Sequence, residues 1–145
     1  MTSTFIVSFT LDTSDATVPL GFEAWIDDQK FHDTDHVAGR QQILMEFPDG
    51  DAEHELRLIM KNKTIEHTRI DETGNIIADA TLTVEDITFD EISLGHMFTE
   101  QVIYTHDFNG TGAMSQHTFY DKMGCNGTVS LKFTSPIYLW LLEHM

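Results

Sequence analysis

Residues 53–94 carry the pattern from which the fold can be predicted, and they read EHELRLIMKNKTIEHTRIDETGNIIADATLTVEDITFDEISL. Apolar and polar residues alternate along much of this segment, which indicates β-strands that bury every second side chain. Four residues at alternate positions share one face of the first strand: His54, Leu56, Leu58 and Met60. The segment therefore predicts paired strands, and it contains no catalytic motif.

The second half of the segment changes its apolar phase twice. Apolar residues stand two apart in three successive pairs: Leu82 and Val84, Ile87 and Phe89, Ile92 and Leu94. Each change of phase needs one extra residue, which Glu85-Asp86 and Asp90-Glu91 supply. A β-bulge inserts such a residue and re-aims the side chains beyond it, so we predict a bulge at both places.

The rest of the chain shows short alternating stretches separated by turn residues. We expect strands at 5–11, 21–31, 41–47, 54–61 and 129–133, with one or two more within 104–125. Asp27-Asp28 is a candidate turn that would split 21–31 into a hairpin. No helix longer than about two turns is indicated. This pattern is typical of an all-β fold, an antiparallel β-sandwich of the jelly-roll type formed by residues 1–135.

A short apolar arm, residues 136–145, follows the last predicted strand. Pro136 should end that strand, and six consecutive apolar residues come next: Ile137, Tyr138, Leu139, Trp140, Leu141 and Leu142. Leaving such side chains in water costs roughly 1.5 to 3 kcal/mol each, so they must be covered. The arm either packs on its own sandwich as a last strand or forms an interface with a neighbouring subunit, and in the second case these six residues are the anchors.

Composition limits the classes of function. The 145 residues suit one domain, and the lone Cys125 cannot form an internal disulfide. The chain has 24 Asp and Glu against 8 Lys and Arg, a formal net charge of −16, which disfavours nucleic acid and anionic membranes as partners. It favours cation binding or a basic partner, and a solvated acidic surface is the alternative. The first ten residues, MTSTFIVSFT, do not resemble a signal peptide, so we do not expect export by that route.

No spacing of residues predicts an enzyme. Cys125 lies in a glycine-flanked turn that matches no protease signature, and only His32 and His36 among the eight histidines are closely spaced. A carboxylate pair that includes Asp107 or Asp71 could still hydrolyse a glycan, although no spacing identifies one. We therefore predict a non-enzymatic protein with no catalytic residues.

Two kinds of binding residue remain as candidates. Asp71, Asn75 and Asp79, together with Glu72, flank one predicted turn and offer the oxygen ligands that calcium prefers, with Asp27 or Asp107 as additional ligands. A solvated acidic rim is the alternative interpretation. Three aromatic residues are candidates for stacking on sugar rings, with core packing as the alternative: Trp25, Tyr104 and Tyr120.

Two segments resemble calcium-dependent xylan-binding modules, which are jelly-roll sandwiches. Residues 53–62, EHELRLIMKN, resemble a strand of that family that begins with histidine and ends at asparagine. Residues 79–87, DATLTVEDI, resemble a later strand that opens with a calcium-binding aspartate. The resemblance implies that Asp79 is a calcium ligand, although residue 63 is lysine where the family has a second ligating aspartate.

The chain as a whole also resembles small structural proteins of contractile-tailed phages that infect marine cyanobacteria. This resemblance rests on an acidic, compact sequence with one cysteine and a short apolar C-terminal arm. It implies a β-sandwich virion subunit, assembled in the host cytoplasm, that contacts other virion subunits or itself. A calcium-dependent carbohydrate-binding module, with calcium as cofactor and a polysaccharide as partner, is the alternative hypothesis.

Overall fold

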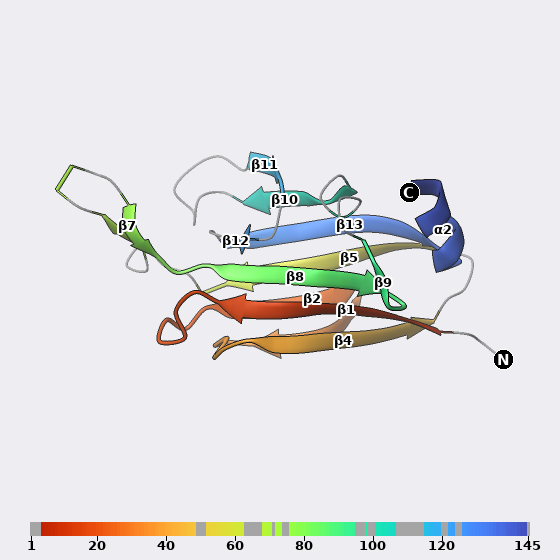
Figure 1. Cartoon of the computed structure of the whole chain (residues 1–145), viewed down its shortest axis with the longest axis horizontal. Helices are drawn as coiled ribbons and strands as arrows, with labels where there is room; N and C mark the ends of the chain where they lie inside the picture. The colour runs from red at the N-terminus through yellow and green to blue at the C-terminus, as the bar shows by residue number, and fades with distance from the viewer. Residues whose placement is uncertain are drawn as a thin grey trace.

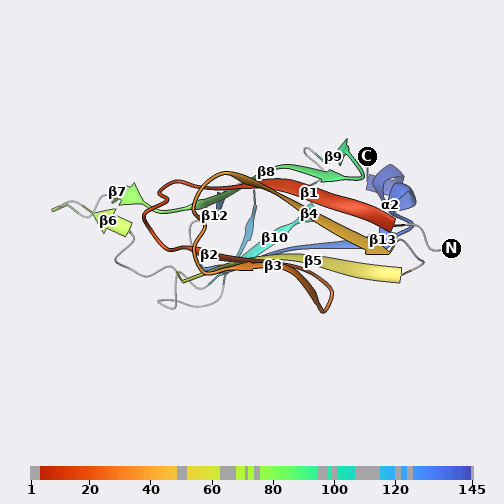
Figure 2. The same cartoon turned by 90° about the horizontal axis from the view of Figure 1, so that it is seen from below.

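A computed structural model shows two antiparallel β-sheets packed face to face, with a helix at one end of the sandwich (Figures 1 and 2). The structure describes residues 4–48, 52–62, 68–70, 72–73, 76–94, 98, 101–106, 115–119, 122–123 and 126–144. The predicted all-β antiparallel sandwich is therefore confirmed.

Each sheet joins strands that are distant in sequence. Sheet A has the order β12-β8-β1-β4, with β9 paired to β8, and sheet B has the order β11-β10-β13-β5-β2-β3. The smaller pair β6-β7 extends from the end of the sandwich opposite α2 (Figure 2). The element bounds are β1 (Thr4–Thr13), β2 (Gly21–Ile26), β3 (Gln29–Thr34), β4 (Gln41–Pro48), β5 (Ala52–Lys61), β6 (Thr68–Ile70), β7 (Ile76–Asp79), β8 (Leu82–Phe89), β9 (Ile92–Ser93), β10 (Ile103–His106), β11 (Ser115–Thr118), β12 (Lys122–Met123), β13 (Gly127–Ser135) and α2 (Ile137–His144).

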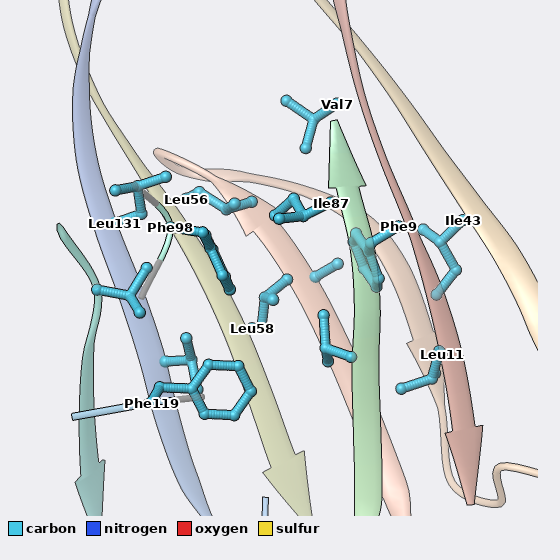
Figure 3. Close-up of a cluster of buried hydrophobic side chains, with 14 of the residues drawn as sticks. Val7, Phe9, Leu11, Ile43, Leu56, Leu58, Ile87, Phe98, Phe119 and Leu131 are labelled. Atoms are coloured by element: carbon cyan, nitrogen blue, oxygen red, sulfur yellow. The ribbon is translucent and has the colours of Figure 1, made fainter. Parts of the chain in front are cut away.

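The core lies between the two sheets and is rich in aromatic rings. Phe5 and Phe89 of sheet A meet Phe133 of sheet B at centroid distances of 5.6 and 5.1 Å. Phe9 meets Phe22 across the sandwich at 5.9 Å. Figure 3 shows aliphatic side chains from both sheets filling the same layer. Alternation along the strands thus places one face of each sheet in this core, as the sequence predicts.

One of the two predicted bulges is present and the other is a turn. Between the pairs Ser8↔Thr88 and Thr10↔Glu85, two residues of β8 oppose one residue of β1, so the bulge at Glu85-Asp86 is confirmed. Asp86 has a positive φ of 54° there.

The prediction of a bulge at Asp90-Glu91 is wrong. Phe89 pairs with Ile92, and the two residues between them have φ values of 51° and 69°. Positive φ at both central residues defines a type I′ hairpin turn, which connects β8 to β9. A tight turn also changes the apolar phase, which is why periodicity alone did not separate the two structures.

The C-terminal arm forms a helix, so the predicted alternative of a last strand is wrong. The carbonyl of Pro136 accepts hydrogen bonds from the amides of Leu139 and Trp140, which begins α2 directly after β13. Proline suits a helix start because its φ is fixed near helical values. An uninterrupted apolar run does not distinguish a buried strand from a helix by its period.

The helix divides the six predicted anchors into two sets. Ile137, Trp140 and Leu141 are buried against the sandwich, and the Trp140 ring lies 5.8 Å from Phe89 and 6.2 Å from Phe133. The other three side chains are exposed to solvent: Tyr138 by 52%, Leu139 by 57% and Leu142 by 69%.

Candidate functional site

A pocket of about 590 Å³ lies where α2 meets sheet B, and we call it the helix-end pocket. Its walls come from the β2–β3 turn, the start of β5, the second half of β13 and one side of α2. The lining residues are Asp27, Glu53, His54, Glu55, Lys132, Phe133, Thr134, Trp140, Glu143 and His144. A volume of this size accommodates a small ligand or a single long side chain.

Asp27 organises the edge of this pocket from the two-residue turn that joins β2 to β3. One oxygen of its carboxylate lies 2.7 Å from Nδ1 of His54, and the other accepts the amide hydrogen of Glu55 at 2.9 Å. Its own amide donates to the carbonyl of Glu55, and its carbonyl accepts from Arg57. The predicted turn at Asp27-Asp28 is confirmed, since Ile26 pairs with Gln29.

His54 is held between this carboxylate and the aromatic core. Its side chain is only 8% exposed, and its ring lies 4.9 Å from Phe47 and 5.4 Å from Phe133. Because the Asp27 carboxylate accepts from Nδ1, the neutral imidazole carries its lone pair on Nε2. Nε2 is buried and has no hydrogen-bond partner among the described residues. The Asp27–His54 pair therefore fixes one tautomer and connects the turn to β5.

The outer wall of the pocket carries carboxylates that are not neutralised. Glu53 and Glu143 are exposed, and neither has an ion-pair partner among the described residues. Glu55 lies 3.6 Å from Nε of Arg57. Lys132 is the one lysine or arginine among the described lining residues, which also include His54 and His144. The pocket combines aromatic rings with an excess of negative charge.

A second polar surface surrounds Trp25 on the outer face of sheet B. The half-buried indole donates from Nε1 to Glu23 at 3.0 Å. Nζ of Lys30 lies 5.3 Å from the ring centroid and the Arg57 guanidinium carbon 5.4 Å, both within cation–π range. These contacts fix the orientation of Trp25, and the two cations occupy positions over its ring.

Beside Trp25, Asp33 joins two lysines from different strands. Its carboxylate oxygens lie 2.6 Å from Nζ of Lys61 and 2.9 Å from Nζ of Lys30. The hydrogen bond from Lys61, followed by that from Lys30, lowers the pKa of Asp33 from 3.8 to about 2. The same hydrogen bonds to Asp33 raise the pKa of Lys61 and of Lys30. The three charges therefore link β3 to β5 across β2 over the full physiological pH range.

Two of the three candidate sugar-stacking residues lie in the part of the chain that the structure describes. Trp25 lies on the outer face of sheet B, as described above. Tyr104 is only 6% exposed and lies 5.9 Å from Phe119, a position that favours the core-packing alternative. Tyr120 lies outside the described residues. The stacking role of these three aromatic residues stays a prediction.

Among the candidate calcium ligands, Asp79 lies at the opposite end of the sandwich from the helix-end pocket. Asp79 ends β7, while Asp71, Asn75 and Asp107 lie outside the described residues. Asp27 does not lie near Asp79, because the Asp27 carboxylate binds His54 and Glu55 near α2. Within the part of the chain that the structure describes, no group of three or more His, Cys, Asp or Glu side chains could hold a metal.

Sequence reasoning did not find the Asp27–His54 pair or the pocket beside α2. The hairpin turn and the strand that starts near His54 were both predicted, but the two residues are 27 positions apart. Only the register of β2 against β5, with Ile26 opposite Leu56, brings them together. No local pattern specifies that register.

Comparison with known proteins supports the fold. No family model matches the chain, and no curated protein matches it either. Among solved structures, the chain is similar to vCBM60, described in work on a circular permutation that links two families of calcium-dependent carbohydrate-binding modules. That match has a TM-score of 0.56 and 10% identity, and it covers 88% of this chain and 89% of that chain.

A second solved structure is vCBM60 in complex with galactobiose. It has a TM-score of 0.52 and 12% identity, and it covers 87% of this chain and 96% of that chain. Identities this low show a shared fold and not a shared ligand.

In the described part of the chain, no helix has the length and hydrophobicity needed to cross a bilayer.

Proposed function

We propose that this chain is a non-enzymatic carbohydrate-binding module that uses calcium. The observation that carries the proposal is the likeness in fold, over 88% of the chain, to a calcium-dependent carbohydrate-binding module. The two segments that resemble xylan-binding modules form β5 and the end of β7 with β8, which are adjacent to the connection that contains the candidate ligands. The sequence resemblance and the likeness in fold therefore agree on the class of protein.

The calcium ion would lie at the turn between β6 and β7. Asp71, Asn75 and Asp79 supply the carboxylate and amide oxygens that this hard cation requires. When bound, calcium would offer open coordination positions to sugar hydroxyls. Trp25, held by Glu23 and its two flanking cations, is the candidate aromatic contact.

Affinity electrophoresis of the full chain in gels that contain xylan or galactan tests this proposal. We expect retardation by at least one polysaccharide in calcium, and loss of that retardation in chelator. Asp79→Asn should weaken the retardation, whereas the matched change Asp86→Asn, at the bulge in β8, should not. Retardation that is unchanged by chelator and by Asp79→Asn would contradict the calcium role, and no retardation by any glycan would contradict carbohydrate binding.

A second candidate function is assembly as a virion subunit in the host cytoplasm, through contacts with other virion subunits or itself. The observation that favours it is the exposure of Tyr138, Leu139 and Leu142 on α2. Light scattering of the full chain tests the self-contact. A defined oligomer that Leu142→Glu disrupts would support self-contact, and a monomer at all concentrations would exclude self-assembly through α2.

A further inference from the structure

The helix α2 presents three neighbouring features to solvent. One side of it, with Trp140, Glu143 and His144, lines the helix-end pocket. The other side contributes Tyr138 to a groove of about 490 Å³ on the outer face of sheet A, where Ile6 and Leu44 are also exposed. Between them, Leu139 and Leu142 form a ridge that is 57% and 69% exposed.

The ridge and the pocket are close enough for one ligand to reach both. Leu139 and Glu143 stand four residues apart on α2, which brings their side chains side by side on the helix surface. Leu142 and Tyr138 are related in the same way. An apolar surface therefore begins at the rim of an acidic, aromatic pocket and continues to the groove on sheet A.

The charge in the pocket favours a cationic ligand. Four carboxylates line it against one lysine, and two of them, Glu53 and Glu143, have no ion-pair partner among the described residues. A guanidinium group is planar, stacks on aromatic rings and hydrogen-bonds two carboxylate oxygens at once. It therefore suits a pocket whose wall has the half-buried His144 ring, stacked 4.7 Å from the buried Trp140 ring, beside Glu53 and Glu143.

We infer that the helix end of the sandwich binds a basic segment of another protein, with an arginine side chain in the helix-end pocket and an adjacent apolar residue on the ridge of Leu139 and Leu142. The inference deepens the assembly role above by naming the chemistry of the partner, and it does not depend on carbohydrate binding. A second copy of this chain is a poor occupant because both copies carry a formal charge of −16. A neutral sugar would leave the apolar ridge exposed.

Peptide titration of the full chain tests the inference. Trp25→Phe leaves Trp140 as the single indole, since the chain has two tryptophans. Acetyl-Leu-Arg-amide is the probe, and acetyl-Leu-citrulline-amide, which has nearly the same shape without the charge, is the control. We expect saturable changes in Trp140 fluorescence and in the amide NMR signals of Leu139 and Glu143, with millimolar affinity that falls as salt rises.

Charge variants then assign the contacts. Glu53→Gln with Glu143→Gln should weaken binding about fivefold, as expected for loss of two partly exposed ion pairs. The charge-matched pair Glu46→Gln with Glu85→Gln, outside the pocket, should leave the affinity unchanged. Equal binding of the citrulline peptide, no saturable response to the arginine peptide, or equal affinity of the two double variants would overturn the inference. Galactobiose moving the same signals in place of the peptide would also overturn it.

Discussion

Asp27 connects the β2–β3 turn to β5 at the helix end of the sandwich, through hydrogen bonds with His54, Glu55 and Arg57. Asp27→Ala removes the acceptor for His54 Nδ1 and for the Glu55 amide, and it places alanine at a φ of 53°. Since a buried donor loses its partner and the backbone becomes strained, we expect the free energy of unfolding to fall by about 2 to 4 kcal/mol. Urea denaturation followed by circular dichroism measures this loss.

The neighbouring aspartate provides the control for that experiment. Asp28 is exposed in the same turn, so Asp28→Ala should change the free energy of unfolding by no more than about 0.5 kcal/mol. Asp27→Asn introduces a side chain that tolerates positive φ, so it should lower the free energy of unfolding less than Asp27→Ala does. Equal effects of the two alanine substitutions would show that the bridge to His54 contributes nothing to stability.

Asp33 gives a prediction about acid stability at the same scale. Its pKa of about 2 lies below the usual 3.8, so its ion pairs stabilise the fold fully above 3.8, and this contribution is lost as the pH falls toward 2. Lys61→Met removes the strongest of these hydrogen bonds and should raise the pKa of Asp33 toward 3.8. Carboxyl carbon NMR against pH measures the change, and Lys132→Met serves as control. An Asp33 that titrates near 3.8 in the unsubstituted chain would refute the described geometry.

At the scale of the element, α2 should stabilise the sandwich through its inner side alone. Trp140 packs on Phe89 and Phe133, so Trp140→Ala should lower the free energy of unfolding by about 3 to 5 kcal/mol. Leu142→Ala, on the exposed side of the same helix, should cost about 0.5 kcal/mol or less. Urea denaturation of both variants compares them. Similar losses would mean that the helix is not docked as described.

The elements also show how far the sequence could predict the fold. Alternation predicted β1, β4, β5, β8 and β13 because burial on one side imposes a period of two. It could not predict α2, since a run that is apolar at every position carries no period. It could not predict the helix-end pocket, because that site needs the register of β2 against β5 and the docking of α2, both set by tertiary packing.

At the scale of the whole molecule, the chain carries a large excess of negative charge. A formal net charge of −16 on 145 residues makes the compact state repel itself, so moderate sodium chloride should raise the melting temperature by screening. Differential scanning fluorimetry over a salt series measures this. Screening predicts a rise that levels off after the first few hundred millimolar, about where the screening length falls below 5 Å. A melting temperature that is independent of salt would contradict the prediction.

In the part of the chain that the structure describes, five non-glycine residues have a positive φ: Asp27, Asn62, Asp86, Asp90 and Glu91. Four of them are acids, and the short Asp and Asn side chains are those that adopt this backbone conformation at least cost. Backbone geometry therefore accounts for part of the negative charge, independently of contacts with solvent or partners. As related sequences diverge, the surface acids elsewhere are free to drift to any polar residue, whereas positions 27, 86 and 90 should accept little besides asparagine and glycine. Substitutions that aim to reduce the net negative charge of this protein should therefore leave the aspartates at these three positions until last.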